Sequence, residues 1–470
     1  MMSAKLTPAA STRTRTSPGR GTGSGASFTC STSGGPALVI QTWRTGTSLR
    51  RGPSRCHGPG ASGLTRSLRD AKRWRVSLVP KPLSRSITLA VTTIILLLVV
   101  LEAGSYVATK LLNRYALFYD PHGTEGYAKY LRVRDPVLGW PQVTEPGTGE
   151  LDARGARIVP SFPDPSASPA CVAVFGDSFT YGDEVSPTDS YPNRLALALD
   201  CRVSNFGVGG YGTDQALLRY RTLRDEHADF VVLGHFTEDI VRNVNQFRNL
   251  QTRSDFGLKP RFLLEADGTL RLVPLPTLTA AEFSRVPDEH ERLLPYEFFR
   301  PGGAAGIVTL RFPYTWRLLS VLGQYRIRAV LGGYPSYAPF YDEDHPSGAL
   351  ELTTAILSTF ASEARARGQA PLVLLIPDVV DLEARRHGSP PPHAPLERAL
   401  RALGVEVLDA GIGLGAALGE REACALYTAC SRSHLNAEGN SVLARSVADR
   451  LRSMAPAGYR FATSAGGGSR

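Results

Sequence analysis

The chain has 470 residues, 42% hydrophobic and 20% charged, a composition typical of a globular protein with room for more than one domain. The net charge of +10 is unevenly distributed, because residues 1–85 contain 15 lysines and arginines and a single acidic residue, Asp70. The remaining chain has 38 basic and 42 acidic residues, a net charge of −4. This distribution argues against nucleic-acid binding, which needs positive charge on a structured surface.

The N-terminal arm, residues 1–85, is rich in Ser, Thr, Gly, Pro and Arg and has no long apolar period over its first 65 residues. Such a segment cannot bury enough apolar surface to offset its ordering entropy, so we predict that it is disordered. Two interpretations stay open. The arm is a cytoplasmic tail that touches anionic lipid or nucleic acid, or translation truly begins near Val76 or Leu78.

Residues 87–107 form an apolar run of about 20 residues, the length that an α-helix needs to cross the hydrocarbon core. Its one charged residue, Glu102, lies near the far end. Lysines and arginines precede the run, and the positive-inside rule places such a flank in the cytoplasm. We therefore predict a transmembrane signal anchor over residues 86–108, with the following chain outside the cytoplasm. A cleaved signal peptide and a buried soluble helix are the alternatives.

A connector over residues 109–169 precedes a domain with alternating strand and helix patterns over residues 170–453. Short apolar segments bounded by Gly, Pro or Asp predict five strands. These are residues 171–176, 201–207, 229–236, 371–378 and 404–410. Helical patterns follow or precede them at residues 190–199, 213–226, 350–367, 394–403 and 437–453. The alternation predicts a three-layer α/β/α fold with a five-stranded parallel sheet. Residues 454–470 are predicted to be a disordered tail.

An insertion over residues 245–345 interrupts this rhythm. Asp267-Gly268 predicts a hairpin, and residues 309–331 form an aromatic, arginine-bearing amphipathic stretch. The insertion is interpreted as a lid or substrate-binding cap, as a surface that rests on the membrane, or as ordinary packing.

The sharpest chemical feature is VAVFGDSFTYG, residues 172–182. A buried strand runs into Gly-Asp-Ser and a helix follows, which places the Ser178 hydroxyl at the carboxyl edge of a parallel sheet, where ligands bind. Gly176 permits the tight turn, and the Ser178 amide can point at a developing oxyanion. An alcohol nucleophile also needs an adjacent base.

Three blocks of sequence resemble the SGNH/GDSL hydrolase superfamily, in its bacterial membrane-anchored branch. Residues 171–182 resemble the block of the nucleophile, and NFGVGGYGTDQALLRY, residues 205–220, resembles the second block, with Gly209 where Pro is common. HLNAEGN, residues 434–440, resembles the block of the catalytic histidine, and DPVLGW resembles the upstream region of that branch. The blocks stand in the expected order over residues 171–453.

The resemblance implies a role for each matching residue. Ser178 would be the nucleophile, and His434 the general base that takes its proton. The amides of Ser178 and Gly210 would form the oxyanion hole. It also implies a bacterial inner-membrane location, single-pass, with the catalytic domain periplasmic or extracellular.

Two positions depart from the family pattern. Ser431 stands where an aspartate usually orients the histidine, so a Ser–His dyad, with Ser431 or a backbone carbonyl holding the ring, is one prediction, and Asp409 is another candidate acid. Glu238 stands where an asparagine usually donates to the oxyanion, and an ionised carboxylate cannot donate. Asn243 or Asn245 is the predicted substitute donor.

The cysteines predict two external disulfides, Cys171 with Cys201 and Cys424 with Cys430, which suit an oxidising compartment. The alternative is small buried thiols. No His/Cys cluster has zinc spacing and no nucleotide fingerprint follows a strand, so we expect neither metal nor cofactor.

The sequence thus predicts a serine esterase that acts through Ser178 and His434 on an acylated glycan, lipid or small-molecule ester. An O-acetyltransferase or acetylesterase of an exported polysaccharide is a close alternative with the same residues. A non-catalytic cell-envelope binding protein on the same scaffold is the alternative from another class.

Overall fold

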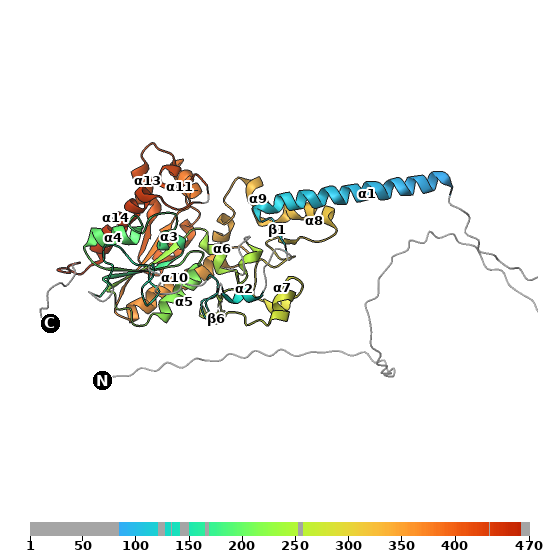
Figure 1. The fold of residues 1–470 in the computed structure, drawn as a ribbon. Helices are drawn as coiled ribbons and strands as arrows, with labels where there is room; N and C mark the ends of the chain where they lie inside the picture. The colour runs from blue at the N-terminus through green and yellow to red at the C-terminus, as the bar shows by residue number, and fades with distance from the viewer. Residues whose placement is uncertain are drawn as a thin grey trace, which may run out of the picture. The chain divides into compact units, whose positions relative to one another are not determined.

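The computed structural model describes residues 84–120, 127–132, 134–141, 150–164, 169–251, 257–431 and 433–461. A five-stranded parallel sheet of order β3-β2-β4-β8-β9 forms its centre (Figure 1). The strands are β2 (Val172–Gly176), β3 (Val203–Gly207), β4 (Phe230–Phe236), β8 (Ala370–Ile376) and β9 (Val407–Asp409). All five predicted strands and the predicted fold class are confirmed. The predicted N-terminal arm, apart from residues 84 and 85, and residues 462–470 lie outside the described residues.

Both faces of the sheet are buried, because successive strand residues point to opposite sides. In β2, Phe175 packs into one hydrophobic core, together with Val231 of β4. Val174 packs into a second core, with Val232 of β4. The two cores explain why these strands are nearly continuous runs of apolar residues and do not alternate with polar ones.

Helices cover both faces, as the alternation of patterns predicted (Figure 1). One core takes residues from α5 (Thr213–Thr222), α10 (Ala349–Ala366) and α12 (Ala394–Ala402). The other takes residues from α4 (Tyr191–Leu199), α13 (Ala410–Leu418) and α14 (Ala437–Met454). Further helices are α3 (Ser178–Tyr181), α6 (Asp239–Asn243) and α11 (Val379–Arg386).

The C-terminal segment after α14 packs onto the second core. The ring of Phe461 stacks on Phe230 with centroids 5.2 Å apart, and the Tyr459 hydroxyl donates to Asp229 at 2.6 Å. Residues 455–461 therefore belong to the folded domain, whereas the sequence pattern had placed them in a disordered tail.

The insertion contains the predicted hairpin and a set of short helices. Strands β5 (Arg261–Leu264) and β6 (Leu270–Val273) pair antiparallel around Asp267-Gly268. The other elements are α7 (Ala280–Leu293), β7 (Val308–Thr309), α8 (Tyr314–Ser320) and α9 (Tyr325–Gly332). The connector contributes β1 (Phe118–Tyr119), which pairs parallel with β7, and α2 (Tyr127–Arg132). The insertion and the connector thus fold together.

The long apolar helix α1 (Arg85–Leu112) is exposed over its apolar window, and by length and composition it could cross a membrane. Near its end, the Glu102 carboxylate accepts hydrogen bonds from the backbone amides of Tyr314, at 2.7 Å, and Thr315. The Ser105 hydroxyl lies 2.9 Å from that of Thr315. The single charge of the apolar run therefore caps the first turn of α8, which has no capping side chain of its own.

Candidate active site

The nucleophile candidate, Ser178, is the first residue of α3, and one residue separates it from the end of β2. The preceding Asp177 caps the helix, because its carboxylate accepts from the Phe179 amide at 2.9 Å. The Ser178 amide, at the first position of a helix, has no intrahelical acceptor and stays available. Tight packing fixes this turn against β3, since a Cβ on Gly207 would lie 2.3 Å from the Tyr181 nitrogen. Ser178 thus stands at the carboxyl edge of the sheet.

The base candidate, His434, comes from the loop before α14 and reaches the same edge. Its Nε2 lies 2.8 Å from Ser178 Oγ, although 256 positions separate the two residues. The Phe179 ring packs beside the imidazole, with centroids 4.8 Å apart. The structure therefore brings together the two residues that the blocks predicted, at the distance a serine needs from its base.

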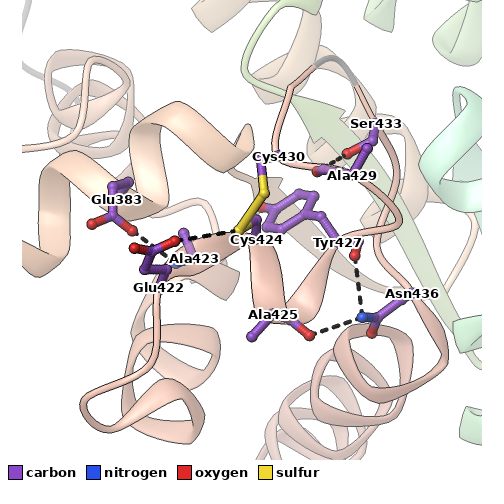
Figure 2. The surroundings of a disulfide bond; sticks show 10 residues. All are labelled: Glu383, Glu422, Ala423, Cys424, Ala425, Tyr427, Ala429, Cys430, Ser433 and Asn436. Atoms are coloured by element: carbon purple, nitrogen blue, oxygen red, sulfur yellow. Dashed lines mark hydrogen bonds between the residues drawn. A yellow bond between two sulfur atoms is a disulfide. The ribbon is translucent and has the colours of Figure 1, made fainter.

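The loop that carries His434 is held at several points (Figure 2). Cys424 and Cys430 form a disulfide, as do Cys171 and Cys201, so both predicted pairs are present. The Asn436 amide donates to the carbonyls of Ala425, at 2.8 Å, and Tyr427. These contacts close the loop upon itself and fix the point at which the chain enters α14.

Gly210 lines the same pocket as Ser178 and has a φ of +81°, in the left-handed region that favours glycine. Trp140 and Pro141 of the connector lie nearest to it. They are placed there by Gln215, whose side-chain amide donates to the carbonyls of Leu138 and Trp140. Gly210 thus lies at the pocket that Ser178 and His434 line, and its role as an oxyanion donor stays a prediction.

Asn243, the predicted substitute donor, does not belong to the described pocket. It is fully buried, its Oδ1 accepts from the Asp214 amide at 3.1 Å and its Nδ2 donates to the Thr353 hydroxyl at 2.9 Å. Asn245 is likewise buried and donates to the carbonyl of Phe247 and to Glu297. The Asn243 amide links α5 to α10, and the Asn245 amide holds the start of the insertion, so neither replaces the missing asparagine.

Arg242 of α6 brings a positive charge to the pocket, next to Glu238. Its guanidinium lies 3.2 Å from the Asp177 carboxylate and 2.6 Å from that of Asp239. Burial raises the pKa of Asp177, while Arg242 opposes this rise. Sequence reasoning missed Arg242. The available signal was its position one helical turn after Glu238 and close to Asp239. Buried carboxylates such as those of Asp177 and Asp239 need a cation beside them.

The carboxylate of Glu184 lies beside Nδ1 of His434, the ring nitrogen that does not face Ser178. Its Oε1 lies 3.2 Å from Nδ1, close enough for an ion pair but not aligned as a straight hydrogen bond. Such contacts often tighten only when substrate binds. Asp409, the acid considered from the sequence, instead pairs with Arg385. Ser431 lies on the pocket wall. Glu184 was not predicted.

The pocket around these residues has a volume of about 770 Å³, within the usual range for small-molecule sites. Part of its wall comes from the turn that follows α1 and from α9 and the loop after it. These segments contribute Arg114, Tyr115, Arg326, Val330 and Tyr334, and Arg248, Asp378 and Glu238 also line the pocket.

One group among the described residues has the composition of a metal site: His393, Glu397 and Asp409, whose ligand atoms lie within 4.8 Å of one another. Both carboxylates already have arginine partners, Arg401 for Glu397 and Arg385 for Asp409. A bound cation would have to displace these guanidinium groups. The group is therefore better described as an ion-pair network than as a metal centre.

No family model and no curated protein sequence matches the chain. Among solved structures, a protein of the G-D-S-L family from Desulfitobacterium hafniense DCB-2 is 11% identical, covers 60% of this chain and 98% of its own, and has a TM-score of 0.29. A catalytic mutant of an acetylxylan esterase from Geobacillus stearothermophilus is 13% identical over 63% of this chain and 98% of its own, with a TM-score of 0.33.

A two-domain esterase active on acetylated mannans is 11% identical, covers 61% of this chain and 55% of its own, and has a TM-score of 0.29. The chain has the α/β fold that the alternation of strand and helix patterns predicted, and the solved structures similar to it include a protein of the G-D-S-L family and acetylxylan esterases.

Proposed function

We propose that this chain is an ester hydrolase of the SGNH/GDSL type, with Ser178 as nucleophile and His434 as general base. The single observation that carries this proposal is the distance of 2.8 Å between Ser178 Oγ and His434 Nε2. A binding protein on the same scaffold would have no need of this alignment, so the contact argues against the non-catalytic alternative.

In the proposed reaction, Ser178 Oγ attacks the acyl carbon while its proton passes to Nε2 of His434. The amides of Ser178 and Gly210 would stabilise the oxyanion, and each such donor is typically worth about 3 kcal/mol. The intermediate collapses as His434 returns the proton to the leaving alcohol. His434 then takes a proton from water, which attacks the acyl-enzyme, and gives this proton to Ser178 Oγ as the acid is released.

We further propose an acylated glycan, lipid or small-molecule ester as substrate. The pocket of about 770 Å³ is much larger than an acetyl group requires, and Tyr115, Tyr334 and the arginines of its wall suit a polar acyl carrier. An O-acetyltransferase would use the same two residues and replace water with a sugar hydroxyl. Release of free acetate from an acetylated oligosaccharide supports hydrolysis, whereas transfer to an added oligosaccharide supports the transferase.

We propose that α1 is the single-pass inner-membrane anchor of the bacterial membrane-anchored branch, with the catalytic domain on the periplasmic or extracellular side. A helix of 28 residues is about 42 Å long, which exceeds the hydrocarbon core of about 30 Å. The basic residues before α1 favour a cytoplasmic N-terminus, and two disulfides suit an oxidising compartment.

The test is covalent labelling of the full chain in detergent with a fluorophosphonate probe. We expect wild type to be labelled and Ser178→Ala not to be labelled. Ser186→Ala is the matched control, because this exposed serine of the same loop hydrogen-bonds Asp189 and not a histidine, so its labelling should equal that of wild type. Folded wild type that resists the probe would contradict the proposal.

A further inference from the structure

Glu184 lies in the loop that follows α3, only six positions after the nucleophile, yet it contacts the loop of the general base. Besides the 3.2 Å approach of Oε1 to Nδ1 of His434, its Oε2 accepts from the His434 backbone amide at 3.2 Å. The Thr428 hydroxyl donates to the same oxygen. Three groups of the histidine loop therefore converge on one carboxylate.

The backbone of Glu184 is itself unusual. Its φ of +66° lies in the left-handed region, which residues other than glycine seldom occupy. Such a conformation persists where the surroundings hold it, and it is frequent at functional sites. Thr428 and His434 are in turn tied together, because the Thr428 amide donates to the His434 carbonyl at 2.9 Å. The strained residue thus connects the loop of the nucleophile to the loop of the base.

The charge of Glu184 is suited to a neighbouring imidazole. The hydrogen bond from the Thr428 hydroxyl and that from the His434 amide lower the pKa of the carboxyl group, so it stays ionised in neutral solution. The side chain is 43% exposed, which means that solvent screens its field. We therefore expect its main effect to come from holding the ring, with a smaller contribution from charge.

We propose that Glu184 is the positioning residue of this site, the carboxylate that orients His434 in place of the acid missing at Ser431. This inference rests on the proposed function. Its chemistry is the usual one: a carboxylate at Nδ1 fixes the tautomer whose Nε2 can accept a proton, and it stabilises the imidazolium that forms. Ser178, His434 and Glu184 would then form a triad in which the nucleophile and the acid come from neighbouring positions in the chain.

The test compares Glu184→Gln and Glu184→Asp with wild type in the full chain, by the rate of fluorophosphonate labelling across pH. We expect Glu184→Gln to lower the rate roughly 10- to 1,000-fold and Glu184→Asp to lower it less. Partial recovery of the rate in Glu184→Asp, which keeps a carboxylate beside Nδ1, marks a role in orienting the ring. A merely structural role would give the same loss in both variants.

Two further variants test whether the effect depends on where the carboxylate lies and not only on its negative charge. Asp183→Asn removes the adjacent carboxylate, and the double variant Glu184→Gln, Ser431→Asp places an acid where the family has it. We expect Asp183→Asn to lower the rate less than Glu184→Gln, and the double variant to recover part of the rate. An Asp183→Asn loss as large as that of Glu184→Gln would overturn the proposal, as would an unchanged rate and profile in Glu184→Gln.

A readout that needs no catalysis keeps this inference separate from the proposed function. The rate at which diethyl pyrocarbonate modifies His434 at one neutral pH, followed by mass spectrometry, reports how firmly the imidazole is held. This rate should rise in Glu184→Gln, whose ring is less restrained, and stay unchanged in Glu343→Gln, an exposed glutamate elsewhere on the domain. An unchanged modification rate in Glu184→Gln would refute the pairing even if wild type were inert toward the fluorophosphonate.

Discussion

Asp378, at the pocket and at the start of α11, allows a prediction about pH. Its carboxylate accepts from the Val379 amide at 2.6 Å, and burial, with the nearby charges of Asp381 and Glu238, raises its pKa to about 7. Between about pH 4 and 7 the unfolded chain has lost this proton while the folded chain keeps it. This group therefore lowers stability progressively as pH rises through that window.

Asp378→Asn should remove this pH dependence and keep the helix cap, because asparagine caps helices as well as aspartate does. We expect the variant to gain stability relative to wild type between pH 4 and pH 8, by up to about 4 kcal/mol at roughly 1.4 kcal/mol per pKa unit. Chemical denaturation of both proteins at the two pH values measures this difference. A difference in unfolding free energy between the two proteins that is the same at both pH values would show that Asp378 ionises normally.

Ser178 and His434 could be predicted because each stands in a short block that combines a strand end or helix start with a reactive side chain. Glu184 could not, since its approach to His434 depends on one left-handed backbone angle and on a contact across 250 positions. Neither leaves a local pattern in the sequence. The expected donor Asn243 failed for a related reason, because burial against Thr353 cannot be read from its neighbours.

Among the elements, strands and long helices were predicted within a few residues, because burial on both faces produces continuous apolar runs and long amphipathic periods. Some helices were missed, among them α13, which is as long as the predicted helices α4 and α12. Helix α13 has the sequence AGIGLGAAL, whose three glycines disfavour a helix by about 1 kcal/mol each relative to alanine. It forms because Ala410, Leu414 and Leu418 pack into the second core, and this tertiary gain is invisible to local propensity.

The disulfide of Cys424 and Cys430 closes a short loop, so its loss should be tolerated. Cys424→Ser with Cys430→Ser is expected to cost about 2 kcal/mol of unfolding free energy, from the entropy of a loop of this size. Labelling of Ser178 at 25 °C should stay within a few-fold of wild type, since Asn436 still closes the loop. Thermal denaturation and labelling of the same sample measure both quantities.

The matched variant removes Cys171 and Cys201, which are 30 positions apart. Its larger loop predicts a larger loss of stability, about 4 kcal/mol in the same treatment. If the loss of the Cys424 disulfide abolished labelling and left the melting temperature unchanged, the disulfide itself would be the element that places His434.

On the scale of the whole molecule, the sequence predicted the apolar helix and the aromatic stretch of residues 309–331 separately, but not their contact. The carboxylate of Glu102 binds the amides that begin α8, and Tyr106 packs edge-on against Tyr314. Beside this contact lies an apolar patch of exposed side chains. Its members are Phe312, Trp316, Leu319, Leu322, Val330 and Leu331. Because the start of α8 packs on α1, we expect the proposed bilayer to cover the exposed side chains of α8 as well.

Trp316, 62% exposed, reports on this arrangement. In liposomes that contain brominated phosphatidylcholine, the full chain should lose part of its tryptophan fluorescence, and Trp316→Phe should abolish much of that quenching. Trp140→Phe, at the half-buried tryptophan of the connector, should leave the quenching in place. Quenching of Trp316 by aqueous iodide and not by the brominated lipid would place the patch in water.

The cap that Glu102 provides also limits how far the catalytic domain can move from the membrane. A domain on a flexible tether samples a volume that widens with the square root of tether length. Here the exit from α1 is held instead, because the Asn113 side chain accepts from the Phe118 amide and β1 pairs with β7. With α1 in the bilayer, Ser178 would stay at a nearly constant distance from the lipid headgroups. Esters held at that distance from the membrane, on a membrane-bound carrier or on a polymer leaving the cell, would meet the nucleophile more often than esters free in solution.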